Sequence, residues 1–151
     1  MTQTPEHQTI QLNGLELAYR FDGPEDGHVV LMANSLMSNY SMWDWNVPAL
    51  ADRYRVLRYD KRGHGGSQTT PGPYSISQLA DDAVALMDAL KIDKVHFIGL
   101  SMGGMIGQQM GARYPERVYS LSYVTPLVRC LQEACGKIDL QLSVRMAFLV
   151  W

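Results

Sequence analysis

The stretch Val95-His96-Phe97-Ile98-Gly99-Leu100-Ser101-Met102-Gly103 decides the fold of this chain. Its first part is short, apolar and rich in β-branched and aromatic residues, as expected of a buried parallel strand. Its second part fits Gly-x-Ser-x-Gly, which places a serine on a sharp turn between a strand and a helix. The following residues, up to Arg113, contain no proline and predict that helix. We therefore predict that Ser101 is a nucleophile on this turn, with Gly99 and Gly103 required because the turn leaves no room for a Cβ atom.

Chemistry at such a serine needs two backbone N–H groups that stabilise the negative charge developing on the substrate oxygen. The first candidate is the N–H of Met102, because Met102 directly follows the serine. The second comes from a loop after an earlier central strand, here Asn34-Ser35-Leu36-Met37-Ser38. Leu36 is the predicted donor. The alternative interpretation of this loop is an ordinary polar connection.

The positions of the histidines set a limit on what the chain can do alone. In this motif, the acid and the histidine base follow the serine along the chain. The chain's four histidines are His7, His28, His64 and His96. All precede Ser101, so we expect the first half of an enzyme, inactive because its catalytic acid and base are missing. We interpret His96 as a packed core histidine and expect Asp60 and Arg62 to make contacts that stabilise a turn.

The composition is that of a globular protein. Hydrophobic residues make up 46% and charged residues 19%, and the net charge is −2, which argues against disorder and nucleic-acid binding. The polar start shows no signal peptide, and no apolar stretch approaches a membrane span. Cys130 and Cys135 are too few for a disulfide scaffold and too far apart for a Cys-x-x-Cys site. We expect a cytoplasmic protein with no metal, no cofactor, no nucleic-acid partner and no membrane partner.

The rest of the pattern predicts a β-hairpin followed by strand–helix units. Asn13-Gly14 separates two alternating runs between Thr9 and Phe21 and predicts the hairpin. Ser75 and Gln78 fit a capping box at the start of a helix. Further elements are expected as strands at 29–33 and 54–59, a helix at 43–51 interrupted by Pro48, and a strand beginning at Val118. This order predicts an α/β fold with a mostly parallel sheet and helices on both faces.

Residues 10–121 resemble the α/β-hydrolase family and, within it, the 3-oxoadipate enol-lactone hydrolases. The matching stretches are Asn34-Ser35-Leu36, Met42-Trp43-Asp44, Tyr59-Asp60, Arg62-Gly63-His64-Gly65, Gly72-Pro73-Tyr74 and residues 99–107. The chain departs from the subgroup at Met37, where glycine is usual. The resemblance implies the N-terminal half of an α/β-hydrolase fold and a serine hydrolase of aromatic catabolism. Its partner would be a small-molecule lactone or ester, with Ser101 as nucleophile. The resemblance also implies that residues 62–65 form a structural turn braced by His64.

The resemblance stops after Leu121, and our hypothesis for the tail is a one-base shift of the reading frame near the codons for Leu121 to Tyr123. In the shifted frame, Cys135-Gly136 allows only tryptophan or arginine, and Met146-Ala147 forces glycine. The shifted codons also permit strings such as Cys-Asp-Thr-Ala-Ser, which resemble what enol-lactone hydrolases carry after this strand. We therefore expect a truncated domain over residues 1–122 and an out-of-frame tail over residues 123–151.

Two other classes of function stay open: a non-catalytic ligand-binding protein on the same fold, and a non-functional fragment. A fragment that lacks its sheet edge is expected to show no cooperative thermal transition. Esterases, perhydrolases and carbon–carbon bond hydrolases share the serine turn. Epoxide hydrolases and dehalogenases use an aspartate nucleophile, so the serine at position 101 argues against both.

Overall fold

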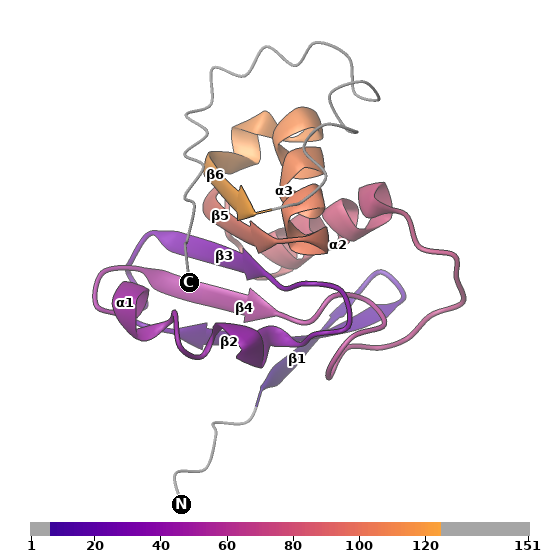
Figure 1. Cartoon of the computed structure of the whole chain (residues 1–151), viewed down its shortest axis with the longest axis horizontal. Helices are drawn as coiled ribbons and strands as arrows, with labels where there is room; N and C mark the ends of the chain where they lie inside the picture. Colours follow the sequence, from indigo (N-terminus) through magenta and orange to yellow (C-terminus); the bar gives the residue numbers. More distant parts are fainter. Residues whose placement is uncertain (1–6, 125–151) are drawn as a thin grey trace, which may run out of the picture.

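A six-stranded sheet organises residues 7–124, the part of the chain that the computed structural model describes (Figure 1). The elements in chain order are β1 (Gln8–Leu12), β2 (Leu15–Asp22), β3 (Val29–Ala33), the 3-10 helix η1 (Tyr40–Trp43), α1 (Pro48–Ala51), β4 (Arg55–Tyr59), α2 (Ile76–Ala89), β5 (Val95–Leu100), α3 (Met102–Arg113), the 3-10 helix η2 (Pro115–Arg117) and β6 (Val118–Val124). The strand order is β1-β2-β4-β3-β5-β6. The pairs β1–β2 and β2–β4 are antiparallel, and β4, β3, β5 and β6 run parallel. The predicted α/β fold with a mostly parallel sheet is confirmed.

Helices cover both faces of this sheet, as predicted, with α2 and α3 on one side and α1 on the other (Figure 1). Side chains alternate along a strand, so β3 contributes to two separate cores. Leu31 and Ala33 join the larger cluster with the buried side chains of α2 and α3. Val30 and Met32 join a smaller cluster with Trp43 of η1. The sheet is therefore a central layer, with the larger core on the side of α2 and α3 and the smaller core on the side of η1 and α1.

Local signals located most elements correctly. The hairpin turns at Asn13-Gly14, where Gly14 has a φ of +78°. The Ser75 hydroxyl accepts a hydrogen bond from the Gln78 N–H at 3.1 Å, which satisfies one of the free N–H groups at the start of α2. Strand β3 has the predicted bounds, and β4 begins one residue later than predicted.

The predicted helix at 43–51 is wrong. Its place is taken by η1, which begins earlier, at Tyr40, and by the single turn of α1. Asn39 starts η1 because its side chain accepts a hydrogen bond from the Ser41 N–H. Pro48 does not interrupt a helix but opens α1, where its missing N–H costs nothing.

Strand β6 includes Tyr123 and Val124, so it continues two residues past the predicted boundary at 122. The predicted out-of-frame tail otherwise lies outside the described residues, as do Cys130 and Cys135. Its origin stays a prediction. Over residues 7–124, no helix has the length and apolar character needed to cross a membrane.

Candidate active site

Ser101 occupies the turn between β5 and α3, in the strand–turn–helix context that the motif requires. Its φ of +54° and ψ of −114° belong to neither element. A positive φ is uncommon for a residue with a Cβ atom and persists only when the surrounding structure enforces it. The Ser101 side chain is half-buried. Met102 begins α3, so its N–H has no acceptor within the helix.

The two glycines of the motif are required by close backbone contacts. A Cβ atom on Gly99 would lie 2.4 Å from the carbonyl carbon of Gly103. A Cβ atom on Gly103 would lie 2.0 Å from the Ala33 carbonyl oxygen and 3.0 Å from that of Asn34. Both first contacts are far below any real Cβ contact, so the predicted reason for these glycines is confirmed. The contact at Gly103 also brings the start of α3 against the end of β3, where the loop with Leu36 begins.

The loop over residues 34–38 is held from within by side chains distant in sequence. The Lys61 ammonium donates to the carbonyl oxygens of Asn34 and Ser35 at 3.0 and 2.9 Å. The Ser38 hydroxyl lies 2.8 Å from the same Ser35 oxygen. The Ser35 N–H points to the Met42 sulfur at 3.4 Å. Within residues 7–124, the Leu36 N–H meets no acceptor, so it is free to bind a ligand oxygen.

Met37 adopts a left-handed backbone conformation, which is common for glycine and uncommon for other residues. Its φ is +58°, in the left-handed region, and its side chain is 92% exposed. Methionine at this position therefore adopts a conformation that glycine takes freely, at a local cost in backbone strain.

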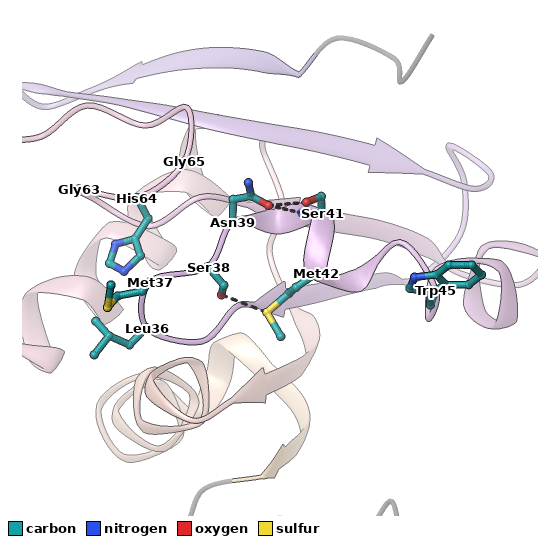
Figure 2. A pocket seen from close by; sticks show the side chains of 10 residues that line it. All are labelled: Leu36, Met37, Ser38, Asn39, Ser41, Met42, Trp45, Gly63, His64 and Gly65. Atoms are coloured by element: carbon teal, nitrogen blue, oxygen red, sulfur yellow. Dashed lines mark hydrogen bonds between the residues drawn. The ribbon is translucent and has the colours of Figure 1, made fainter. Parts of the chain in front are cut away.

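An open pocket of about 760 Å³ lies beside this loop (Figure 2). Its wall is formed by Leu36, Met37, Ser38, Asn39, Ser41, Met42, Trp45, Gly63, His64 and Gly65. Figure 2 shows His64 above Leu36 and Met37 at one end and Trp45 at the other. Leu36 and Trp45 are 59% and 95% exposed, which is unusual for large apolar side chains. Ser101 does not line this pocket, so Leu36 is the predicted site residue found there.

Asp60 and Arg62 stabilise the turn after β4, as expected. The Asp60 carboxylate accepts hydrogen bonds from the backbone N–H groups of Tyr40 and Gly66 at 2.6 and 2.8 Å. Arg62 makes a two-pronged ion pair with Asp82 at 2.8 and 2.6 Å. The His64 Nδ1 atom lies 3.1 Å from the Arg62 carbonyl oxygen, consistent with the bracing role predicted for His64.

The hydrogen bonds and ring contacts of the four histidines are made with residues other than Ser101. His96 precedes Ser101 by five residues along β5, a separation of about 16 Å at about 3.3 Å per residue. Its Nδ1 lies 2.8 Å from the Ser120 hydroxyl, and its ring contacts that of His28. His7 contacts the ring of Tyr40 instead. Over residues 7–124, no hydrogen bond joins a histidine to the serine.

The interpretation of His96 as a core histidine is wrong. Strand alternation turns it away from α2 and α3, and η1 and α1 pack mainly on β3 and β4. It is half-buried beside His28, Tyr54 and Tyr119. Burial, and next the proximity of His28, lower its pKa. His96 therefore belongs to a surface aromatic cluster at the opposite end of the strands from Ser101.

Over the described residues, no group of three or more His, Cys, Asp or Glu side chains comes together in a way that could hold a metal ion. Lys61 is the site residue that the sequence pattern missed. A lysine between an aspartate and an arginine is typical of a solvated turn, yet its side chain is 1% exposed. Its position directly after a central strand is the signal that could have identified it, because the carboxyl ends of parallel strands carry the site in open α/β sheets.

The comparisons with known proteins agree with this geometry. The family model for the alpha/beta hydrolase fold matches residues 28–146, which runs past the predicted boundary at 122. The 3-oxoadipate enol-lactonase 2 of Acinetobacter baylyi is 42% identical over 109 residues, or 72% of this chain and 41% of the relative. A putative carbamate hydrolase RutD of Variovorax paradoxus is 35% identical over 112 residues, covering 73% and 42%. This chain thus spans less than half the length of these curated relatives.

Solved structures of hydrolases also superpose on this chain. The enol-lactonase from Burkholderia xenovorans LB400 superposes with a TM-score of 0.75 at 44% identity, over 76% of this chain and 45% of that chain. A hydrolase from Pseudomonas aeruginosa PA01 superposes with a TM-score of 0.76 at 39% identity, covering 80% and 46%. The resemblance to enol-lactone hydrolases is confirmed, and the chain belongs to the α/β-hydrolase family.

Proposed function

We propose that this chain is the N-terminal part of a serine hydrolase that opens a small lactone or ester, with Ser101 as the nucleophile. The observation that carries the proposal is the conformation of Ser101, held at a positive φ where β5 meets α3. Relatives support the substrate class, since two are named 3-oxoadipate enol-lactonases. A third, Est816, is described as an N-acyl homoserine lactone degrading enzyme and is 32% identical with a TM-score of 0.72.

In the proposed reaction, the Ser101 oxygen attacks the carbonyl carbon of the lactone while a base takes the serine proton. The N–H groups of Met102 and Leu36 stabilise the resulting oxyanion, and the start of α3 adds the positive end of its dipole. The ring C–O bond then breaks, which leaves an acyl-enzyme and an enolate that takes up the proton. Water releases the acid and regenerates Ser101. Loss of one oxyanion donor is expected to cost about 3–4 kcal/mol of transition-state stabilisation.

The proposal places the catalytic acid and base outside this chain. All four histidines precede Ser101, and those with ring hydrogen bonds use them elsewhere. We infer that a shifted reading frame encodes the acid and the histidine, in a further stretch of about 100 residues that completes a single domain. The chain of 151 residues by itself is then a hydrolase without its proton-transfer groups.

The test compares the chain as it stands with a gene whose frame is restored near the codons for Leu121 to Tyr123. The 151-residue chain is expected to hydrolyse 3-oxoadipate enol-lactone no faster than its Ser101→Ala variant. The restored protein is expected to hydrolyse it, with activity abolished by Ser101→Ala. Ser101-dependent turnover by the short chain near neutral pH would contradict the missing base. Substrate binding without turnover by the restored protein would favour the ligand-binding alternative.

A further inference from the structure

Lys61 is a buried lysine beneath the loop that carries the Leu36 N–H. We propose that it is a positioning residue: its ammonium holds two successive carbonyls of that loop and thereby aims the Leu36 N–H as an oxyanion donor. The inference rests on the proposed function for the meaning of that N–H, but the orientation itself can be measured without catalysis.

The contacts of Lys61 are unusual for a buried lysine. Its side chain is 1% exposed, and over residues 7–124 no carboxylate oxygen lies within 4 Å of its nitrogen. Asp60 is adjacent in sequence, but its oxygens accept from the backbone at Tyr40 and Gly66. The buried charge is instead satisfied by the carbonyls of Asn34 and Ser35, at 3.0 and 2.9 Å. A buried ammonium is costly without such partners, so the two bonds hold the loop and the lysine together.

Peptide geometry transmits this contact to the proposed oxyanion site. In a trans peptide the N–H points opposite to the C=O of the preceding residue. The single cis peptide among residues 7–124 is Gly72–Pro73, so the Ser35–Leu36 peptide is trans. Because Lys61 holds the Ser35 oxygen on the inner side of the loop, the Leu36 N–H must point to the outer side. Without the lysine, the plane of that peptide is restrained by the Ser38 hydroxyl alone.

The same lysine connects the loop to the serine turn. The Asn34 carbonyl that accepts from Lys61 lies 3.0 Å from the position of a Cβ atom on Gly103, in the first turn of α3. The two proposed oxyanion donors, on Leu36 and Met102, therefore belong to segments that meet at this carbonyl. A rotation of the Asn34 or Ser35 peptide would move one donor relative to the other.

The Lys61 ammonium loses its proton at a pH that a solution experiment can reach. Burial lowers its pKa to about 8, against a smaller opposing effect of the Asp60 charge. The loop that packs on its nitrogen, residues 34–38, contributes no titratable side chain. The His64 ring lines the same pocket as Leu36, so a change at the Leu36 amide reports the Lys61 contact only where it follows the Lys61 Cε shift and is absent in Lys61→Met.

Nuclear magnetic resonance of the isotope-labelled 151-residue chain tests the proposal in two measurements. The first follows the Leu36 amide shift and the Lys61 Cε shift from pH 6.5 to 9.5, and we expect both to titrate together near pH 8. The second measures residual dipolar couplings, which report N–H directions, in wild type, Lys61→Met and the control Lys91→Met, whose lysine is exposed.

In Lys61→Met, we expect the Leu36 coupling to lose its wild-type value while couplings in β3 are kept, and we expect Lys91→Met to change neither. A wild-type Leu36 coupling in a folded Lys61→Met chain would overturn the proposal. If that variant does not fold, the wild-type titration decides: a Leu36 amide that stays constant while Lys61 titrates would also overturn it. Neither readout involves Ser101, so failure of the proposed hydrolase function leaves both results interpretable.

Discussion

The serine turn at Ser101 and the loop over residues 34–38 meet at the same end of the sheet, yet different forces hold them. The turn is fixed by backbone crowding, since Cβ atoms on Gly99 or Gly103 would overlap backbone atoms. The loop is fixed by polar side chains, above all by Lys61, which lies more than twenty residues later in the chain. The crowding at Gly99 comes from residues 103 and 104 and is encoded locally, whereas the contact of Gly103 with Ala33 and the polar support of the loop are assembled only by the fold. The two regions should therefore respond differently to substitution and to pH.

The largest effect on stability is expected from Gly103→Ala. An alanine in a helix is ordinarily stabilising by about 1 kcal/mol relative to glycine. Here its Cβ would lie 2.0 Å from the Ala33 carbonyl oxygen, a backbone atom of a central strand that cannot move aside. We expect a net loss of about 3 kcal/mol, at the upper end of overpacking costs. Urea denaturation of the frame-restored protein measures it, here and in the comparisons below, because a chain that lacks a sheet edge is not expected to unfold cooperatively.

Gly14→Ala is the matched control for that substitution. Nothing lies within 4 Å of a Cβ atom there, so only its φ of +78° matters. We expect a loss of about 1 kcal/mol. A Gly103→Ala variant no less stable than Gly14→Ala would show that crowding does not hold the serine turn.

The loop should show a pH dependence that the turn lacks. Lys61 has a pKa of about 8 in the folded chain and 10.5 as its ordinary value, so between these the unfolded chain binds more protons. The free energy of unfolding should therefore rise between pH 8 and 10, by about 2 kcal/mol. Burial also raises the pKa of Tyr59, so above about pH 10 the unfolded chain loses a proton that the folded chain keeps. The free energy of unfolding should therefore fall above about pH 10, which ends the rise caused by Lys61.

Urea midpoints at pH 8 and 10 measure this rise in wild type and in Lys61→Met. The rise should be absent in Lys61→Met and retained in Lys91→Met. Equal rises in the wild-type chain and in Lys61→Met would assign the pH dependence to another group.

The smallest effect is expected from Met37→Gly. The left-handed backbone at Met37 costs about 1 kcal/mol, part of which the greater freedom of glycine in the unfolded chain offsets. Because the side chain is 92% exposed, its removal loses no packing. We expect a gain of about 0.5 kcal/mol, whereas Met37→Ala should change nothing. A destabilised glycine variant would mean that Met37 supports the loop through contacts of its side chain.

The same difference explains which features could be predicted from sequence. Asn13-Gly14, the Ser75 cap and Gly99 act on residues at most five positions away, and the turns and element starts they predict are confirmed. The helix expected at 43–51 failed because Asn39 and Pro48 start two separate turns. His96 was misplaced because strand alternation does not tell which parts of a sheet face are covered. Lys61 was missed because its burial depends on a loop that precedes it by more than twenty residues.

Covalent labelling tests the central claim, that Ser101 is the nucleophile, most directly. The frame-restored protein, its Ser101→Ala variant and the 151-residue chain would each be treated with a fluorophosphonate, and the modified peptide located by mass spectrometry. We expect a single adduct on Ser101 in the restored protein and none in the other two, because one lacks the serine and the other lacks the base. An adduct on another residue of the restored protein, or undiminished labelling of Ser101→Ala, would contradict the account.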